Sequence, residues 1–252
     1  LTYSMGIKNI LISQPVPATL APYTDLTSKY GVNIEFMPFF KVETLSAKEF
    51  RAQRINILDF TAIVFTSKTT IDAFFKLCEE LRITVPEDMK YFCTSESIAV
   101  YLQKHIVYRK RKIFFGNGTI ASIPELIGNK HKEEKFLIAS TENQKTDLHK
   151  LFAKTKYKFD SAAFVKTIIS DLTQTDLHNY EIIVVYTPQD VKSIFENYPD
   201  FAPENIRFAA FGPASLKALK AVKITPQILA PTPEAPSVAK ALDLYLASDK
   251  NV

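Results

Sequence analysis

The chain has 252 residues, 46% of them hydrophobic and 23% charged, which is the composition of an ordinary globular protein. Its formal net charge of +4 suits an anionic ligand but is too small to indicate nucleic-acid binding. With only Cys78 and Cys93, both expected to be buried, the sequence excludes a disulfide framework and a cysteine zinc site. No apolar run approaches the roughly 20 residues of a membrane helix, and no signal peptide opens the chain. We therefore expect a cytoplasmic protein whose native start is Met5.

Strand-like apolar runs alternate with segments of helical spacing along almost the whole chain. The first pair is NILIS (9–13) followed by LAPYTDLTSKYG (20–31), in which Gly31 is a helix stop. Continuous runs of Val, Ile, Phe and Ala are typical of strands buried on both faces of a parallel sheet, so the pattern predicts doubly wound α/β layers. The further strand–helix pairs are 62–67 with 69–81, 89–93 with 95–105, 111–115 with 119–128, 135–140 with 147–155, 181–186 with 190–198, 207–211 with 214–222, and 226–230 with 237–247.

Two extended stretches interrupt this alternation, IEFMPFFKVETL (34–45) and FDSAAFVKTIISDL (159–172). One leaving a lobe and one returning to it would form a pair of connecting strands. AIVFTSKTTIDAFF (62–75) and IIVVYTPQDVKSIF (182–195) also repeat one strand–turn–helix layout. We predict two similar parallel-sheet α/β lobes, flavodoxin-like or Rossmann-like, joined by a two-stranded β ladder. The predicted bounds are 1–36 with 172–252 for lobe 1, 45–158 for lobe 2, and 37–44 with 159–171 for the ladder.

The residues that follow the predicted strands are small, hydroxylic or glycine. Ligands of open parallel sheets bind beyond the carboxyl ends of the strands, where helix N-termini offer unpaired N–H groups to anions. Two such rows facing one another across a cleft would suit a ligand with several separated anions. The strand ends are Ser13-Gln14, Thr66-Ser67-Lys68, Thr94-Ser95, Gly116-Asn117-Gly118-Thr119, Thr187-Pro188-Gln189, Gly212-Pro213 and Pro231-Thr232.

Plainer interpretations stay open at each of these corners. Ser and Thr before a helix are usually N-caps, each worth about 1 kcal/mol, and Gly-Asn-Gly is a common turn that lacks dinucleotide-binding spacing. The basic run Arg109–Lys112 is more typical of a solvated edge than of a binding patch. The four histidines are scattered, and neither a Gly-x-Ser-x-Gly elbow nor a Walker loop occurs. The residues alone predict an anion-binding cleft without specifying a reaction.

Five segments, taken together and in order, resemble uroporphyrinogen-III synthases, especially the Bacteroidetes-like version of that family. The likeness runs from about Lys8 to Leu246, and its order and spacing are more specific than any single motif. The resemblance implies two α/β lobes joined by a two-stranded ladder, in agreement with the layout predicted above. The segments are VFTSKTTIDAFF (64–75), YFCTSESIAVYL (91–102), FFGNGT (114–119), FAAFGPASLKAL (208–219) and APTPEAPSVAKAL (230–242).

The resemblance also implies a reaction, a partner and a site. The family is a cofactor-independent hydro-lyase of haem biosynthesis that closes hydroxymethylbilane, a linear tetrapyrrole with eight carboxylates, to uroporphyrinogen III. Water is lost and ring D is inverted. We expect a monomer that binds neither nucleic acid nor membrane. The family's cleft-lining, substrate-binding positions are occupied here by Thr66, Ser67, Gly116, Asn117, Gly118, Thr119, Lys145, Thr187, Gly212, Pro213, Ser215 and Thr232.

Three positions depart from the family pattern. Gln14 and Ser140 stand where the family often has arginine. Val165 stands where its tyrosine, the favoured donor to the leaving hydroxyl, is usual. Valine cannot donate a hydrogen bond, so we expect Tyr186, at the end of another strand, to be the catalytic residue.

Two other function classes remain. A non-catalytic relative that binds a tetrapyrrole or a similar polyanion in the same cleft is favoured by Val165. A pair of phosphoacceptor receiver domains is disfavoured, because Ser13-Gln14 and Thr66-Ser67 supply no acidic cluster at the strand ends.

Overall fold

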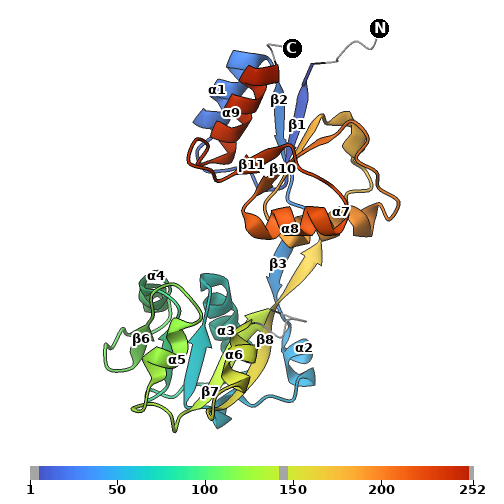
Figure 1. Cartoon of the computed structure of the whole chain (residues 1–252). Helices are drawn as coiled ribbons and strands as arrows, with labels where there is room; N and C mark the ends of the chain where they lie inside the picture. Colours follow the sequence, from blue (N-terminus) through green and yellow to red (C-terminus); the bar gives the residue numbers. More distant parts are fainter. Residues whose placement is uncertain (1–5, 142–146, 250–252) are drawn as a thin grey trace. The chain divides into compact units, whose positions relative to one another are not determined.

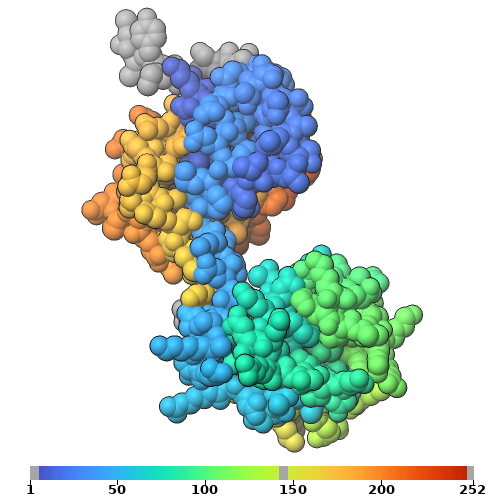
Figure 2. All heavy atoms as spheres, turned by 180° about the vertical axis from the view of Figure 1, so that it is seen from behind, coloured from blue at the N-terminus to red at the C-terminus, as the bar shows by residue number. Residues whose placement is uncertain are grey.

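The computed structural model describes residues 6–141 and 147–249. The chain divides into two compact units, which we call unit 1 (Leu1–Lys41 with Ile168–Val252) and unit 2 (Val42–Thr167). In Figure 2 the blue N-terminal residues and the yellow to orange residues that follow unit 2 form one body, and the cyan to green residues form the other.

Unit 1 is built on a parallel sheet with strand order β11-β10-β9-β1-β2. The register places Ile10 of β1 opposite Ile34 of β2 and Ile182 of β9. This order is flavodoxin-like, and the direction of winding reverses between β1 and β9. The strands are β1 (Asn9–Ile12), β2 (Asn33–Phe36), β9 (Ile182–Val185), β10 (Arg207–Phe211) and β11 (Ile228–Ala230).

Helices cover both faces of this sheet (Figure 1). α1 (Ala21–Tyr30) packs beside α9 (Val238–Asp249) on one face, and α7 (Pro188–Asn197) beside α8 (Pro213–Ala221) on the other; η3 (Leu177–Asn179) precedes β9. The strands are buried on both sides because successive side chains point to opposite faces. Ile10 and Ile12 pack in the core with α1 and α9, whereas Leu11 packs with α7 and α8.

Unit 2 is built on a sheet of order β3-β8-β7-β4-β5-β6, parallel from β8 to β6. Counted from β7, these five strands repeat the order of unit 1, so the winding reverses between β7 and β4. β3 runs antiparallel beside β8, since Leu45 N donates to Phe164 O and Ser170 N to Phe39 O. The strands are β3 (Phe40–Thr44), β4 (Ala62–Phe65), β5 (Lys90–Cys93), β6 (Ile113–Phe115), β7 (Lys135–Thr141) and β8 (Lys158–Ile169).

The helices of unit 2 also form two layers. The larger core joins β4 and β5 to the first group of helices and contains Phe50, Phe74 and Phe164; the smaller core joins the opposite strand faces to the second group through Ile123 and Phe152. The first group is α2 (Ala47–Ala52), α3 (Lys68–Glu80), α4 (Glu96–Tyr101) and the short η1 (Ile57–Asp59) and η2 (Leu102–Lys104), and the second is α5 (Ser122–Ile127) and α6 (Asp147–Ala153).

The predicted fold class, two parallel-sheet α/β lobes with a connecting ladder, is confirmed. The numerical bounds given for the lobes and the ladder stay predictions. Two details differ from the sequence expectation. The first half of β8 pairs with β7 and so belongs to the parallel sheet of unit 2, with a register shift at Ser140/Thr141. α2 was not expected, because six residues show too little periodicity to be recognised.

Candidate functional site

The carboxyl ends of the unit 1 strands meet at one edge of the sheet, because all five strands are parallel. The structure brings together there the predicted corners of this unit: Ser13 after β1, Tyr186-Thr187 after β9, Gly212-Pro213 after β10 and Thr232 after β11. This edge is where a parallel sheet binds its ligands.

The corner between β9 and α7 is held by a capping box. Thr187 is the N-cap, and its hydroxyl accepts from Asp190 N at 3.4 Å. The Asp190 Oδ2 atom in turn accepts from Thr187 N at 2.9 Å and from Tyr186 N at 2.8 Å. Asp190 is not among the residues predicted above, although the spacing Thr187-x-x-Asp190 is a signal for this motif.

Asp190 is fully buried, at the point where the winding of the sheet reverses. Burial raises the pKa of its carboxyl group, against the Tyr186 and Thr187 N–H groups and the Ser13 hydroxyl, which favour the charged form. Within the described part of the chain, neither Asp190 Oδ1 nor Ser13 Oγ makes a hydrogen bond of good geometry. A perturbed carboxyl group at such a place is a candidate functional group.

Tyr186 lies beside this carboxyl group, half-buried at the end of β9. Its ring packs 5.2 Å from that of Phe211. Burial, and after it the neighbouring Tyr23 hydroxyl, raises the pKa of Tyr186. The phenol therefore stays protonated at neutral pH and can donate a hydrogen bond.

The corners after β10 and β11 are held in shape by hydrogen bonds between side-chain hydroxyls and the backbone of the same turns. Gly212 has φ 84°, a conformation that side-chain-bearing residues rarely adopt. Ser215 is fully buried, and its hydroxyl lies 2.7 Å from Phe211 O and 3.0 Å from Gly212 O, to which it can donate. The Thr232 hydroxyl accepts from Ala235 N at 3.0 Å. Ser215 and Thr232 thus fix the backbone, while Pro213 is exposed.

Unit 2 repeats the arrangement at the corner between β4 and α3. Ser67 is the N-cap, and its hydroxyl accepts from Thr70 N at 3.2 Å. Thr70 occupies the place that Asp190 has in unit 1, and it donates its own hydroxyl to Ser67 O at 2.9 Å. Thr66 is exposed. The capping role that the sequence analysis kept open is therefore real for Ser67 and Thr187.

The loop between β6 and α5 contains Gly116, Asn117, Gly118 and Thr119 at the same edge of unit 2. Gly118 N donates to Thr94 O at 2.7 Å, and Asn117 Oδ1 accepts from Thr119 N at 3.1 Å and from its hydroxyl at 2.7 Å. A Cβ on Gly116 would lie 2.0 Å from Ser122 Oγ. The loop is fixed by its own polar groups, and the Asn117 and Thr119 side chains are exposed.

The remaining predicted positions lie elsewhere or outside the described residues. Val165 is 2% exposed and packs in the larger core of unit 2, and the next residue, Lys166, pairs with Glu49 at 2.6 Å. Ser140 is buried and donates to Ala162 O at 3.1 Å. Lys145 falls in the segment 142–146, which is not described.

Both cysteines are buried and free, as expected. In residues 6–141 and 147–249, no group of three or more His, Cys, Asp or Glu side chains could hold a metal ion. Over the same residues, every helix is too short or too polar to cross a membrane.

Comparison with known proteins gives the family. A search of curated proteins found no match. The fold resembles that of a mutant uroporphyrinogen III synthase from Thermus thermophilus, with a TM-score of 0.60 and 13% identity over 97% of this chain and 99% of that one. It also resembles uroporphyrinogen-III synthetase from Helicobacter pylori, with a TM-score of 0.60 and 17% identity over 96% and 100%. The family model for uroporphyrinogen-III synthase HemD matches residues 21–240, and the chain belongs to this family.

Proposed function

We propose that the protein is a uroporphyrinogen-III synthase, which cyclises hydroxymethylbilane to uroporphyrinogen III with loss of water and inversion of ring D. The observation that carries the proposal is the family match over residues 21–240. It is supported by two sheets of the same strand order, each with small and hydroxylic residues at its carboxyl edge. The reaction is that of a hydro-lyase, and the chain's own residues supply positioning and hydrogen bonds.

The substrate's eight carboxylates require many separated hydrogen-bond donors, which we assign to the two carboxyl edges. In our proposal the exposed side chains of Thr66, Asn117 and Thr119 contact the substrate directly, together with backbone N–H groups of the corners. Ser215 and Thr232 act through the turns that they hold. The complete proposed set is Thr66, Ser67, Gly116, Asn117, Gly118, Thr119, Lys145, Thr187, Gly212, Pro213, Ser215 and Thr232.

The chemistry that we propose is mainly orientation. Departure of the substrate hydroxyl leaves an electrophilic azafulvene, and attack by ring D at its substituted carbon gives a spiro intermediate that collapses to the type III ring. Without the protein, the open chain closes to the type I isomer. The protein has to favour one geometry, and holding reacting groups in place can supply several kcal/mol of the barrier.

Tyr186 is our proposed donor to the leaving hydroxyl. Its phenol is kept protonated by burial, and its backbone N–H is held by Asp190. Asp190 is a positioning residue in this proposal, because its carboxylate fixes the corner from which Tyr186 projects. A general acid typically accelerates a reaction ~10²–10⁴-fold. A reactive substrate can tolerate the loss of that acceleration.

The test supplies purified protein with freshly generated hydroxymethylbilane, oxidises the products and separates uroporphyrin isomers I and III. We expect isomer III to predominate. Isomer I at the level of the protein-free reaction would overturn the synthase proposal. The non-catalytic relative, which Val165 favours, would then be tested by titration with uroporphyrinogen III.

The role of Tyr186 has a separate test. Tyr186→Phe removes the hydroxyl and keeps the ring that packs on Phe211, so we expect turnover to fall ~10²–10⁴-fold with little change in folding. Tyr30→Phe is the matched control: Tyr30 is the last residue of α1 and donates its hydroxyl to Asp243 of α9, away from the strand corners, so turnover should be unchanged. An active Tyr186→Phe enzyme would remove this assignment and leave the synthase proposal intact.

A further inference from the structure

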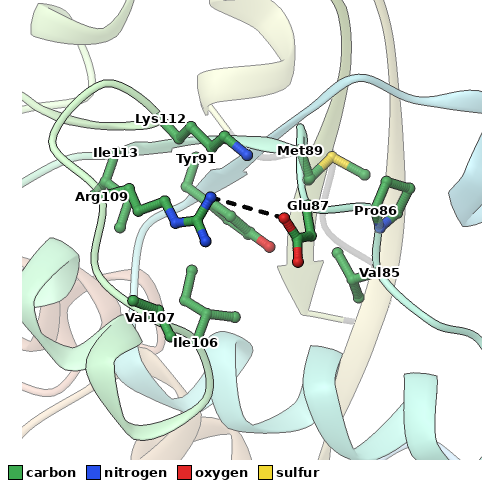
Figure 3. Close-up of a pocket in the computed structure, with 10 residues that line it drawn as sticks. All are labelled: Val85, Pro86, Glu87, Met89, Tyr91, Ile106, Val107, Arg109, Lys112 and Ile113. Atoms are coloured by element: carbon green, nitrogen blue, oxygen red, sulfur yellow. Dashed lines mark ion pairs between the residues drawn. The ribbon is translucent and has the colours of Figure 1, made fainter.

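Unit 2 contains a cavity at the amino ends of β5 and β6, the end of the sheet opposite to the strand corners described above. Its volume is about 200 Å³, and it lies beneath the loops that precede these two strands. Figure 3 shows the ten side chains around it. A tetrapyrrole is far too large to enter this space, so the cavity is not part of the proposed synthase site.

Tyr91 of β5 provides a hydrogen-bonding hydroxyl at the wall of the cavity. The residue is 4% exposed, and its hydroxyl points into the space between the loops (Figure 3). That hydroxyl makes no hydrogen bond to any of the described residues, and it is not among their buried atoms without a partner, so its oxygen is accessible from the cavity. It is therefore available to a ligand. Burial also raises the pKa of Tyr91, which keeps the hydroxyl protonated and able to donate.

The mouth of the cavity carries a weakly engaged cation. Arg109 Nη1 lies 3.7 Å from Glu87 Oε2, and the two side chains are 42% and 88% exposed (Figure 3). Such an exposed ion pair contributes little stability. Lys112 adds a second positive charge, so a ligand carboxylate could replace Glu87 at Arg109 and form a charge-assisted pair with two hydrogen bonds.

The walls of the cavity are apolar and set the size of the ligand. A cavity of ~150 Å³ lined by aliphatic side chains can hold benzene, so about 200 Å³ accommodates one ring and a small polar group. The apolar wall consists of Val85, Pro86, Met89, Ile106, Val107 and Ile113.

We propose that this cavity is a binding site for a small amphipathic monocarboxylate, with a ring-sized apolar body between the loops and a carboxylate held by Tyr91, Arg109 and Lys112. This assigns a role to part of the basic run 109–112, which the proposed synthase reaction does not use. It also makes Glu87 a competitor for the ligand's position at Arg109.

The experiment titrates the full chain with benzoate and follows backbone amide resonances by two-dimensional NMR, with benzyl alcohol as the uncharged probe. We expect saturable shifts at residues around Tyr91 and Arg109, and much weaker shifts with benzyl alcohol. Saturable benzoate shifts confined to the carboxyl edge of a sheet, or none at all, would overturn the proposal. Because the readout is binding, its failure leaves the isomer assay of the synthase unaffected.

Four variants test the chemistry. Arg109→Gln should weaken benzoate binding about tenfold or more, because a hydrogen bond to a charged group is lost. Tyr91→Phe should weaken it several-fold. Glu87→Gln should strengthen it, since the competing carboxylate is gone. Lys110→Gln, which removes a charge from the same run without lining the cavity, is the matched control and should bind as the unmodified protein does. Equal losses in Lys110→Gln and Arg109→Gln would show a diffuse charge effect and overturn the site.

Discussion

Asp190 combines two properties that conflict in a buried side chain. Its Oδ2 atom accepts hydrogen bonds from two backbone N–H groups, those of Tyr186 and Thr187. Its burial, however, penalises the negative charge. In unit 2 the corresponding residue is the neutral Thr70, and the corner there closes without a carboxylate. A charge is therefore not needed to form this turn, so the positioning role proposed for Asp190 rests on its hydrogen bonds to the Tyr186 and Thr187 N–H groups and not on its charge.

Two substitutions of Asp190 separate the contribution of its hydrogen bonds to stability from that of its charge. Asp190→Ala leaves the Tyr186 and Thr187 N–H groups unpaired and should lower the free energy of unfolding by about 1–3 kcal/mol. Asp190→Asn keeps an oxygen acceptor without a charge, so at pH 7 it should be at least as stable as the unmodified protein. Urea unfolding of both variants measures this. A loss in Asp190→Asn as large as that in Asp190→Ala would show that the charge itself holds the corner.

The difference in stability between Asp190→Asn and the unmodified protein should change with pH in a definite direction. The folded-state pKa of Asp190 lies above its ordinary value of 3.8, so the stability that this group contributes is fully present below that value. It is lost as the pH rises through the folded-state pKa. The advantage of Asp190→Asn should therefore be small in acid and grow toward neutral pH. An advantage that does not change between acid and neutral pH would contradict the raised pKa.

Val165 gives a residue-scale prediction about packing. Because its side chain is 2% exposed in the larger core of unit 2, tyrosine at this position has no room for its ring. We expect Val165→Tyr to lower the free energy of unfolding by about 1–3 kcal/mol, as measured by urea denaturation, without raising turnover. Val165→Ile, which adds one methylene, is the milder control. A stable Val165→Tyr protein with much higher turnover would instead show that the tyrosine reaches substrate.

The candidate residues were predictable from sequence to different degrees. Ser67 and Thr187 follow apolar runs and precede helical spacing, and both lie where that pattern indicates. The burial of Ser215, by contrast, depends on its contacts with Phe211 and Gly212, and no local pattern reveals it. Asp190 carried a capping-box signal, but its burial follows from the packing of α7 on the sheet, where the adjacent Val191 shares a buried cluster with Leu11 of β1.

At the scale of elements, the loop between β6 and α5 shows how a short glycine-rich segment acquires a fixed shape. Gly116 allows Ser122 to approach the strand end, and Ser122 Oγ then donates to Thr119 O at 2.6 Å. Gly118 takes a positive φ of 97°. Glycine therefore serves two different purposes in Gly-Asn-Gly, close approach at the first position and backbone conformation at the second.

The steric role of Gly116 is testable against another glycine. Gly116→Ala places a Cβ 2.0 Å from Ser122 Oγ and 3.3 Å from Thr94 O, so it should lower the free energy of unfolding by about 1–3 kcal/mol. Gly6→Ala meets nothing within 4 Å and should stay within about 0.5 kcal/mol of the unmodified protein. Equal thermal unfolding midpoints for the two variants would contradict this account of the loop.

The positions of the central strands were largely predictable, because strands such as β4 and β9 are continuous apolar runs. Val64 of β4 and Ile183 of β9, for example, are both fully buried, one in each sheet. The length of β8 was not predictable. Ala162, Phe164 and Val165 are all buried, and the register shift at Ser140/Thr141 removes the simple alternation that would mark one face.

At the scale of the whole molecule, the two units use one strand order with different starting points. In unit 1 the chain enters at β1 and β2 and returns at β9, whereas unit 2 begins at β4 and ends with β7 and β8. The repeated strand–turn–helix corners, with Thr70 and Asp190 in matching places, therefore fall at the same point of each sheet. Sequence similarity between the halves is weak because the common requirement is only an apolar strand, a cap and an amphipathic helix.

This organisation predicts that unit 2 folds by itself. The segment 42–167 is continuous in the chain and contains two buried clusters that join its sheet to α2, α3 and α4 on one face and to α5 and α6 on the other. A domain with its own core is expected to unfold cooperatively. Expressed alone, residues 42–167 should give dispersed amide resonances and one urea transition, and Phe74→Ala, which truncates a fully buried ring, should lower the free energy of unfolding by about 3–5 kcal/mol. Collapsed resonances or a non-cooperative transition in the isolated segment would mean that unit 2 needs the flanking residues of β3 and β8 to close its edge.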